Sequence, residues 1–330
     1  MQKMENPPDD NLDSDQDIIR AEVVEVMAGA PWQWQEVRPV RPRRRWRLPL
    51  LLFVATCLST WLAGIDLKDG WWAGLLLGLR YAVPVMTILI CHEMGHFIQA
   101  WRYGVYASLP YFIPMPISPI GTFGAVIAME PRMGHRRALF DIGITGPLAG
   151  LVPTLIFCIV GLHYSKPAPM STAPNEWIFG APFLFHDWIF GAPLLFRILM
   201  AHFVSLSPGT GMIELDPMAF AGWVGLLVTS LNLIPIGQLD GGHILYALLR
   251  RKANRVASLL LLAALILVIL NWQTLGGWTL MLFLLMMMGP MHPPTADDNE
   301  PLGAVRIVLG WLTLAFIFVG FTPTPILGPS

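Results

Sequence analysis

The stretch ILICHEMGHFIQ, residues 88 to 99, decides the fold because it places a metal-binding pattern within an apolar segment. His92, Glu93 and His96 spell H-E-x-x-H, and residues four apart share one helix face, so both imidazoles can point at one metal ion. The residues just before it, YAVPVMTILIC (81–91), are apolar enough for a bilayer interior. Ionisable residues are costly in such a segment and generally serve a function there.

The composition of the chain is that of a membrane protein. Of its 330 residues, 55% are hydrophobic and only 13% are charged, whereas soluble domains carry about a quarter charged residues. The net charge of −1 gives no reason to expect a nucleic-acid partner. The cysteines all lie in apolar runs, which suits small buried side chains better than a disulfide framework: Cys57, Cys91 and Cys158.

Apolar stretches divide the chain into predicted membrane spans, since about 20 apolar residues cross the hydrocarbon core. Arg80 and Pro84 are expected to separate a short entry segment from the helix that carries the motif. The predicted fold is an all-α polytopic membrane protein of about six or seven transmembrane helices. We place the spans at 48–65, 71–101, 142–165, 217–239, twice within 256–290 around the turn NWQTLGGW, and at 307–321 before the tail FTPTPILGPS.

One apolar segment cannot be a lipid-facing helix. Residues 105–130 hold several prolines and two glycines, and the backbone groups that these residues free would stay unpaired in lipid. We therefore expect extended strands at Pro110–Pro119 and Gly121–Met129, which form a short membrane-associated β-hairpin or sheet near the active site.

The rest of the chain divides into a tail and one membrane-embedded domain. Residues 1–45 are acidic and then basic, which predicts a largely disordered tail, and residues 46–330 form the domain. The loop 164–215 carries a duplication, WIFGAPFLF (177–185) and WIFGAPLLF (188–196). We expect this duplicated stretch to lie at the membrane interface, with Trp and Phe as anchors.

Basic residues predict the orientation. Segments rich in arginine stay on the cytoplasmic side, and they occur at 38–47, 131–138 and 250–255, whereas the loop 164–215 is poor in Lys and Arg. The N-terminus is therefore expected in the cytoplasm, with His92 and His96 toward the cytoplasmic end of their helix. We expect an integral protein of a prokaryotic plasma (inner) membrane.

The residue types of the motif favour zinc chemistry. Neutral imidazoles suit Zn²⁺, and a catalytic zinc has three protein ligands and an open position for water. Glu93 lies about 100° around the helix from His92, so its carboxylate can reach that water without binding the metal. Glu93 would act as general base toward the water and then as general acid toward the leaving amine.

The third ligand must come from another part of the chain. Asp240 ends an otherwise uncharged predicted span within NLIPIGQLDGGHI (232–244), at the same expected depth as the motif. His243 could be a partner of Asp240 or an alternative ligand, but we favour a helix-start residue near the surface. The remaining histidines are expected in solvated positions: His135, His163, His186, His202 and His292.

Taken together, HEMGH and the distant N-x-x-P-x-x-x-x-D-G (232–241) resemble the site-2 protease family of intramembrane zinc metalloproteases. The resemblance implies one zinc ion per chain, held by His92, His96 and Asp240. It also implies Glu93 as catalytic acid and base, and Asn232 near the metal, where its amide could hold the substrate carbonyl or oxyanion.

Further segments agree with this resemblance over roughly residues 72–252. GTFGAVIAME (121–130) is similar to the family's extended segment beside the active site, which implies substrate contacts for Gly121, Phe123 and Gly124. ALFDIGITGPLAG (138–150) is similar to the helix start that follows. The loop 164–215 is too short for a PDZ domain, so the chain resembles the compact branch without PDZ or CBS domains, found in cyanobacteria, plastids and other bacteria.

The implied function is hydrolysis of peptide bonds in or near transmembrane segments of membrane-protein substrates, as in regulated intramembrane proteolysis. The implied partners are such substrates and the lipid bilayer. Three alternatives remain: a catalytically silent scaffold or chaperone that keeps the fold, a secondary transporter, and an H-E-x-x-H protease that acts on cytosolic loops. The intact metal motif disfavours the silent scaffold, and the lack of an inverted repeat disfavours the transporter. An Asp as third ligand disfavours the protease of cytosolic loops.

Overall fold

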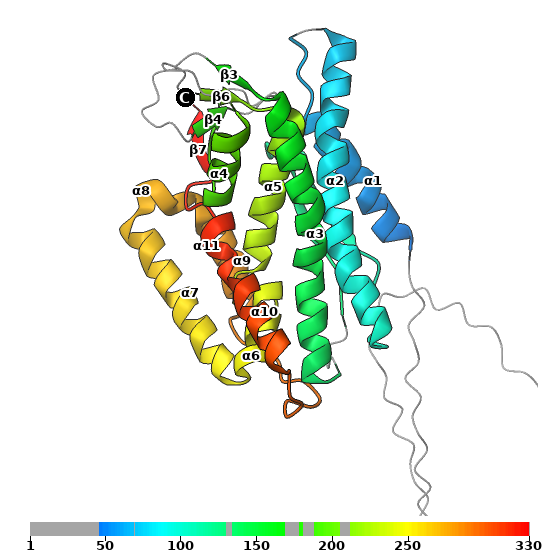
Figure 1. Cartoon of the computed structure of the whole chain (residues 1–330), viewed down its shortest axis with the longest axis vertical. Coiled ribbons are helices and arrows are strands. Elements are labelled where there is room, and N and C mark those ends of the chain that lie inside the picture. The colour runs from blue at the N-terminus through cyan, green and yellow to red at the C-terminus, as the bar shows by residue number, and fades with distance from the viewer. Residues whose placement is uncertain are drawn as a thin grey trace, which may run out of the picture. The chain divides into compact units, whose positions relative to one another are not determined.

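The computed structural model describes residues 46–68, 70–129, 134–168, 178–180, 188–204 and 212–329. The predicted tail, 1–45, lies outside these ranges, as does most of the duplicated loop. The described part is mostly helical and carries two small sheets (Figure 1).

Three helices lie side by side at the centre: α2 (Trp71–Arg102), α3 (Arg136–Tyr164) and α5 (Pro217–Asn232) (Figure 1). Within the described residues, α2, α3 and α7 (Lys252–Leu270) are long and apolar enough to cross a membrane, judged by length and composition. The structure thus supports a helical membrane protein with three such helices, while the other apolar helices are shorter than a full span.

Helix α2 is continuous, so the predicted division at Arg80 and Pro84 is wrong. Pro84 is buried inside the helix, and packed membrane helices tolerate proline because neighbouring elements compensate for the lost backbone bond. The charge of Arg80 is neutralised where it stands, since its guanidinium lies 2.7 Å from the Asp216 carboxylate. Asp216 also caps α5 by accepting a hydrogen bond from the Met218 N–H.

The predicted span at 217–239 is broken before its expected end. Helix α5 ends at Asn232, an irregular turn follows, and α6 (Asp240–Leu249) begins with Asp240. A Cβ on Gly241 would lie 1.9 Å from the Leu233 carbonyl oxygen, so only glycine lets α6 pack directly on the turn. Asp240 thus opens a helix, where the helix dipole favours a negative charge.

Helices α3 and α5 approach closely through small residues. A Cβ on Gly161 would lie 2.0 Å from the backbone nitrogen of Ala219, and one on Gly222 would lie 2.7 Å from that of Cys158. Small residues at such crossings let membrane helices make extensive van der Waals contact.

A hairpin of β1 (Tyr111–Met115) and β2 (Gly121–Val126) confirms the two predicted extended strands. Helix α1 (Arg47–Ala63) packs on it, and the Ser59 hydroxyl donates a 2.6 Å hydrogen bond to the Gly121 carbonyl oxygen. Gly121 has φ +77°, and a Cβ there would meet Thr60 at 2.7 Å.

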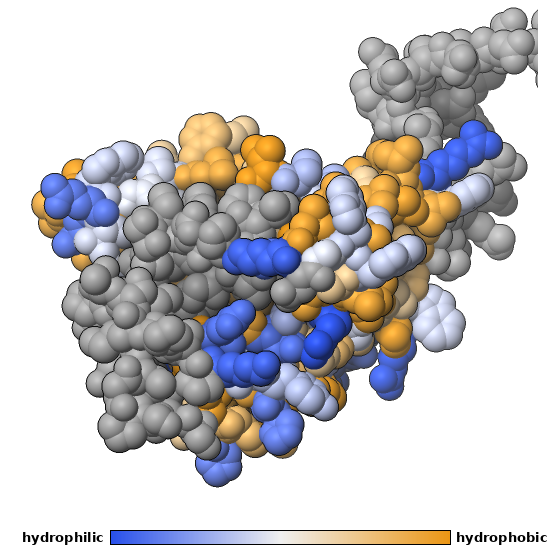
Figure 2. Space-filling view, turned by 90° about the horizontal axis from the view of Figure 1, so that it is seen from above, coloured by the Kyte–Doolittle hydropathy of each residue, from blue (hydrophilic) through white to orange (hydrophobic). Residues whose placement is uncertain are grey.

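The second sheet joins both copies of the duplication. Its order is β3 (Lys166–Ala168), β6 (Met212–Glu214), β4 (Ile178–Gly180), β5 (Trp188–Gly191) and β7 (Ile326–Pro329). Strands β4 and β5 come from the two copies and pair antiparallel, and the stretch predicted as a tail supplies β7. Seen from the end that carries this sheet, hydrophilic patches alternate with hydrophobic residues on the surface (Figure 2).

The second copy of the duplication packs into the core, which corrects the expectation that it anchors at the interface. Phe190 is fully buried against the Trp223 ring, with ring centroids 5.2 Å apart. The Trp223 indole N–H donates a 3.0 Å hydrogen bond to the Gly191 carbonyl oxygen. The same copy then continues into α4 (Leu194–Phe203).

The predicted turn at NWQTLGGW is confirmed. Helix α7 is followed by α8 (Trp272–Leu275), a 3-10 turn (Gly276–Trp278) and α9 (Thr279–Met288). An irregular segment, 289–303, then leads to α10 (Ala304–Ala315) and α11 (Ile317–Gly320). The side chains of α7 are mostly exposed and aliphatic, as lipid contact would require.

Replacing Gly161 with leucine should separate α3 from α5 and lower the free energy of unfolding by about 3 kcal/mol, because overpacked cores must shift. Thermal unfolding in detergent measures the effect. Gly277→Leu is the control, since a Cβ at Gly277 has no heavy atom within 4 Å. Equal stability of the two variants would contradict the close crossing.

Candidate metal centre

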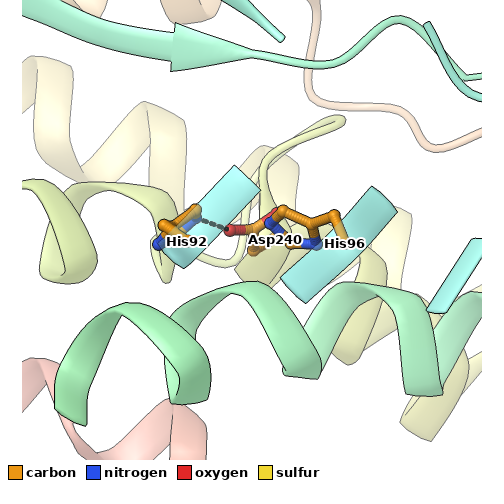
Figure 3. A group of neighbouring side chains, drawn as sticks. All are labelled: His92, His96 and Asp240. Carbon is orange, nitrogen blue, oxygen red and sulfur yellow. Dashed lines mark hydrogen bonds and ion pairs between the residues drawn. The ribbon is translucent and has the colours of Figure 1, made fainter. Parts of the chain in front are cut away.

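Three side chains from α2 and α6 converge on one point. The Asp240 carboxylate lies between the two histidines of the motif (Figure 3), with Oδ2 3.1 Å from His92 Nε2 and Oδ1 3.2 Å from His96 Nε2. One ligand atom from each of the three lies within 4.8 Å of the others. The structure thus brings together two motifs that are 148 residues apart in sequence.

The orientation of His96 is fixed by a backbone hydrogen bond. Its Nδ1 lies 2.7 Å from the Ile142 carbonyl oxygen on α3, and a carbonyl can only accept, so Nδ1 carries the hydrogen. The Nε2 lone pair of the neutral ring is therefore left for a metal on the Asp240 side. Such outer hydrogen bonds commonly set the tautomer of metal-binding histidines.

Glycines on α3 make room for both histidines. A Cβ on Gly146 would lie 2.0 Å from His96 Nε2, and one on Gly150 would lie 3.0 Å from His92 Cβ. Helix α3 runs along the cluster (Figure 3). The GPLAG stretch thus provides the surface against which both imidazole rings pack.

The position of α6, and with it that of Asp240, is held at both ends. Gly241 and Gly242 pack its first turn on the preceding backbone. At the other end, the Arg136 guanidinium donates hydrogen bonds to the carbonyl oxygens of Ala247 at 2.6 Å and Leu248 at 3.2 Å. Arg136 therefore satisfies carbonyls that the end of a helix leaves unpaired.

The donor set fits a divalent cation. His92, Glu93 and His96 are buried, so two carboxylates and two imidazoles share a poorly solvated site. Buried carboxylates need a compensating positive charge, and a 2+ ion would balance the two negative charges beside neutral histidines. Two imidazole nitrogens and one carboxylate oxygen are a typical zinc set that leaves one position open.

A cavity of about 400 Å³ lies over the three converging side chains, and Glu93 and Asn232 line it as well. The Asn232 amide nitrogen lies 3.2 Å from His92 Nε2. Two segments outside the helices, 125–129 and 292–295, line it too. Glu93 thus lies at the cavity beside the cluster, where a general base would have to stand.

The predicted substrate-contact residues lie beside this cavity and do not line it. Gly121 backs onto α1, Phe123 is 51% exposed, and a Cβ added to Gly124 would have no heavy atom within 4 Å. The cavity wall begins with the next residue, Ala125, and continues to Met129.

Two histidines that we expected near the surface are buried. His243 is 6% exposed and His292 is 8% exposed, both line the cavity, and their Nδ1 and Nε2 atoms lie 2.7 Å apart. His243 packs against Gly143 of α3, which brings it inside. His292 is buried by contacts with Tyr246 and Asn254 of distant helices, which no local pattern indicates.

The other histidines lie away from the centre. His163 and His202 are exposed, as expected. His135 is partly exposed and its Nδ1 lies 2.6 Å from a Glu300 carboxylate oxygen. His186 lies outside the described residues.

A methyl group at position 146 should weaken metal binding. In Gly146→Ala the added Cβ would displace the His96 ring, and disturbing the support of a ligand costs about 10-fold to 100-fold in affinity. Gly150→Ala should cost less, because its closest contact is 3.0 Å. Competition with a chelator measures the affinities, Gly277→Ala is the control, and unchanged affinity in Gly146→Ala would refute the packing argument.

Comparisons with known proteins agree with these motifs. The family model described as Peptidase family M50 matches residues 80–271. The probable zinc metalloprotease EGY2, chloroplastic, of Arabidopsis thaliana is 30% identical over 248 residues, which cover 75% of this chain and 42% of that protein. The probable zinc metalloprotease EGY1, chloroplastic, of the same plant is 30% identical over 250 residues, 74% of this chain and 43% of that protein.

The probable zinc metalloprotease EGY2, chloroplastic, of Oryza sativa subsp. indica is 27% identical over 224 residues, 68% of this chain and 39% of that protein. The chain thus spans about two fifths of the length of these curated relatives. Their names describe chloroplast proteins, which does not fit the expected prokaryotic plasma membrane. No solved structure shows a significant match to the chain.

The family match covers 192 of the 330 residues, counted from 80 to 271. It includes the H-E-x-x-H motif, the α3 glycines and Asp240, and it confirms the resemblance found in the sequence. The chain belongs to Peptidase family M50.

Proposed function

We propose that the protein is an intramembrane zinc metalloprotease that hydrolyses peptide bonds in or near transmembrane segments of membrane-protein substrates. One observation carries this proposal: the two histidines of H-E-x-x-H and the distant Asp240 face one point beside a cavity that Glu93 also lines. The names of the similar plant proteins, which describe zinc metalloproteases, support the same chemistry.

In this proposal His92, His96 and Asp240 hold one zinc ion per chain. Zinc, when bound, polarises the scissile carbonyl and makes water acidic enough to act as a nucleophile near neutral pH. Glu93 accepts the proton of the attacking water and returns it to the nitrogen of the leaving amine. Asn232 points its amide toward the same point and donates a hydrogen bond to the oxygen that becomes negative.

A helical substrate must unwind before its scissile bond is accessible, and we propose that the strand continuing β2 holds it open. Both backbone groups of Ala128 are paired with Ser108. The Ala128 carbonyl oxygen accepts from the Ser108 N–H at 2.9 Å, and the Ala128 N–H donates to the Ser108 hydroxyl oxygen at 3.0 Å. Backbone groups of a strand alternate in direction, so those of Ile127 point to the opposite edge. A substrate strand can add there, and Gly121, Phe123 and Gly124 would contact its continuation.

The arrangement in the membrane follows from the basic residues. We propose six or seven spans within 46–330, a cytoplasmic N-terminal tail at 1–45 and an external loop at 164–215. Arg136 donates to carbonyls at the end of α6, so the basic starts of α3 and α7 lie at one end of the bundle, which supports a cytoplasmic side there. His92 lies ten residues before Arg102 on α2, about 15 Å along the helix axis, so water can reach the site from that side.

The proposed partners are transmembrane protein substrates and the lipid bilayer, with no nucleic acid. The chloroplast location in the relatives' names favours a membrane of a plastid or a related bacterium over an unspecified prokaryotic plasma membrane. A silent scaffold that keeps the protease fold is the second candidate, and the complete set of His92, Glu93, His96 and Asp240 disfavours it.

Glu93→Gln should keep zinc and lose cleavage, because the amide fits the same space but cannot take a proton. The expected loss of rate is about 10²-fold to 10⁴-fold, against about 10²-fold to 10³-fold for Asn232→Ala. Purified protein is reconstituted in liposomes together with a panel of tagged single-span proteins. The rate of cleavage and the zinc content are measured in the same samples. Cleavage at the wild-type rate in Glu93→Gln would refute its role, and zinc binding without any wild-type cleavage would favour the scaffold.

Ile127→Pro should reduce cleavage without loss of zinc, because proline removes the N–H that points toward the added strand. Ile127→Ala is the matched control, since it shortens the side chain and keeps that N–H. Equal cleavage by the two variants would rule out strand addition at this edge.

A further inference from the structure

We propose that residues 292–295, which we call the proline wall, select the substrate side chain beside the scissile bond, and that His292 is the residue that positions this wall. The proposal rests on the proposed proteolytic function. The proline wall consists of His292, Pro293, Pro294 and Thr295, and all four line the same cavity as the segment 125–129.

The two walls differ in what they offer a bound peptide. The segment 125–129 offers the backbone groups of Ile127, as proposed above, whereas Pro293 and Pro294 have no N–H. The Pro293 carbonyl oxygen is already engaged, since His292 Nδ1 lies 2.6 Å away and donates to it. The two prolines therefore cannot donate to a substrate strand, and they contribute apolar surface to the cavity.

This chemistry suits an apolar side chain. Met129 and Met288 line the same cavity as the prolines and add apolar surface to it. A substrate strand that pairs with the segment 125–129 through its backbone points its side chains out of the plane of pairing, and one of them can pack on the proline wall. Full burial of a leucine-sized side chain stabilises a complex by about 1.5–3 kcal/mol.

His292 connects the proline wall to the bundle. Its ring stacks on Tyr246 of α6 with centroids 4.5 Å apart. Its backbone is held by Asn254 of α7, whose amide oxygen accepts from the His292 N–H at 3.0 Å and whose amide nitrogen donates to the His292 carbonyl oxygen at 3.3 Å. The wall thus depends on contacts with two helices.

Hydrogen-bond accounting fixes the tautomers of the histidine pair. Because His292 Nδ1 donates to a carbonyl, Nε2 of the neutral ring must accept, and His243 Nδ1 is its donor at 2.7 Å. Burial lowers the pKa of His292, which keeps the ring neutral at physiological pH. Removing the imidazole would leave the buried His243 N–H unpaired and free the wall from α6.

The test measures side-chain selection directly, without knowledge of a natural substrate. Leucine hydroxamate, asparagine hydroxamate and glycine hydroxamate all bind zinc through the same group and differ only in the side chain. Binding to the zinc-loaded full-length protein in detergent is measured by calorimetry, with zinc-free protein as the blank. The variants are His292→Ala, His292→Gln and Pro294→Ala, and Asn299→Ala is the control because its side chain is exposed in the same segment.

We expect the wild type to prefer leucine hydroxamate over glycine hydroxamate by about tenfold and over asparagine hydroxamate. His292→Ala should lose most of this preference at unchanged zinc content and unchanged glycine hydroxamate affinity. His292→Gln, which keeps an acceptor for His243 and a donor for Pro293, should restore it. Pro294→Ala should show a partial loss and Asn299→Ala none.

Several results would overturn the proposal: no preference in the wild type, no hydroxamate binding to the zinc-loaded protein, or a preference that His292→Ala retains. An equal loss of affinity for all three hydroxamates would assign His292 a merely structural role. Turnover of membrane substrates is measured separately. Selective hydroxamate binding without turnover would contradict the proposed function but not side-chain selection by the proline wall. Turnover without selective binding would contradict side-chain selection but not the proposed function.

Discussion

The structure depends on one constraint: carboxylates and imidazoles must be buried together among helices whose surfaces suit lipid. Two carboxylates and two histidines meet between α2, α3 and α6, and an uncompensated charge there would cost far more than any single apolar contact provides. A divalent cation held between them would balance the two negative charges. The glycines of α3 under the imidazoles and those at the start of α6 are what allow the side chains to come close together.

The break between α5 and α6 places Asn232 and Asp240 at the site. Because the helix stops at Asn232 and restarts at Asp240, the break brings an amide and a carboxylate to one depth in the bundle. The cavity beside them is lined by helix residues and also by two segments outside the helices, 125–129 and 292–295. Extended backbone inside a membrane bundle is tolerated only where protein or water satisfies it, so a cleft for an unwound peptide is a natural use for it.

The sequence predicted what depends on local patterns. The spacing of H-E-x-x-H, the prolines of the hairpin and the turn after α7 each act over a few residues, and the hairpin and the turn are confirmed. The roles of His92, His96 and Asp240 stay predictions, although the structure brings the three together. The break after Asn232 was missed because the turn is as apolar as the helix before it, and the burial of His243 and His292 depends on contacts between distant elements. The second copy of the duplication enters the core through contacts with Trp223 that no local pattern reveals.

The most direct measurement is the zinc content of the detergent-purified protein, for the wild type, Asp240→Ala and His243→Ala. We expect about one zinc per chain in the wild type, since the three ligands form one site. Loss or strong weakening is expected in Asp240→Ala, and retention in His243→Ala. Full retention in Asp240→Ala would contradict a centre built from both motifs, and loss in His243→Ala alone would move the third ligand to that histidine.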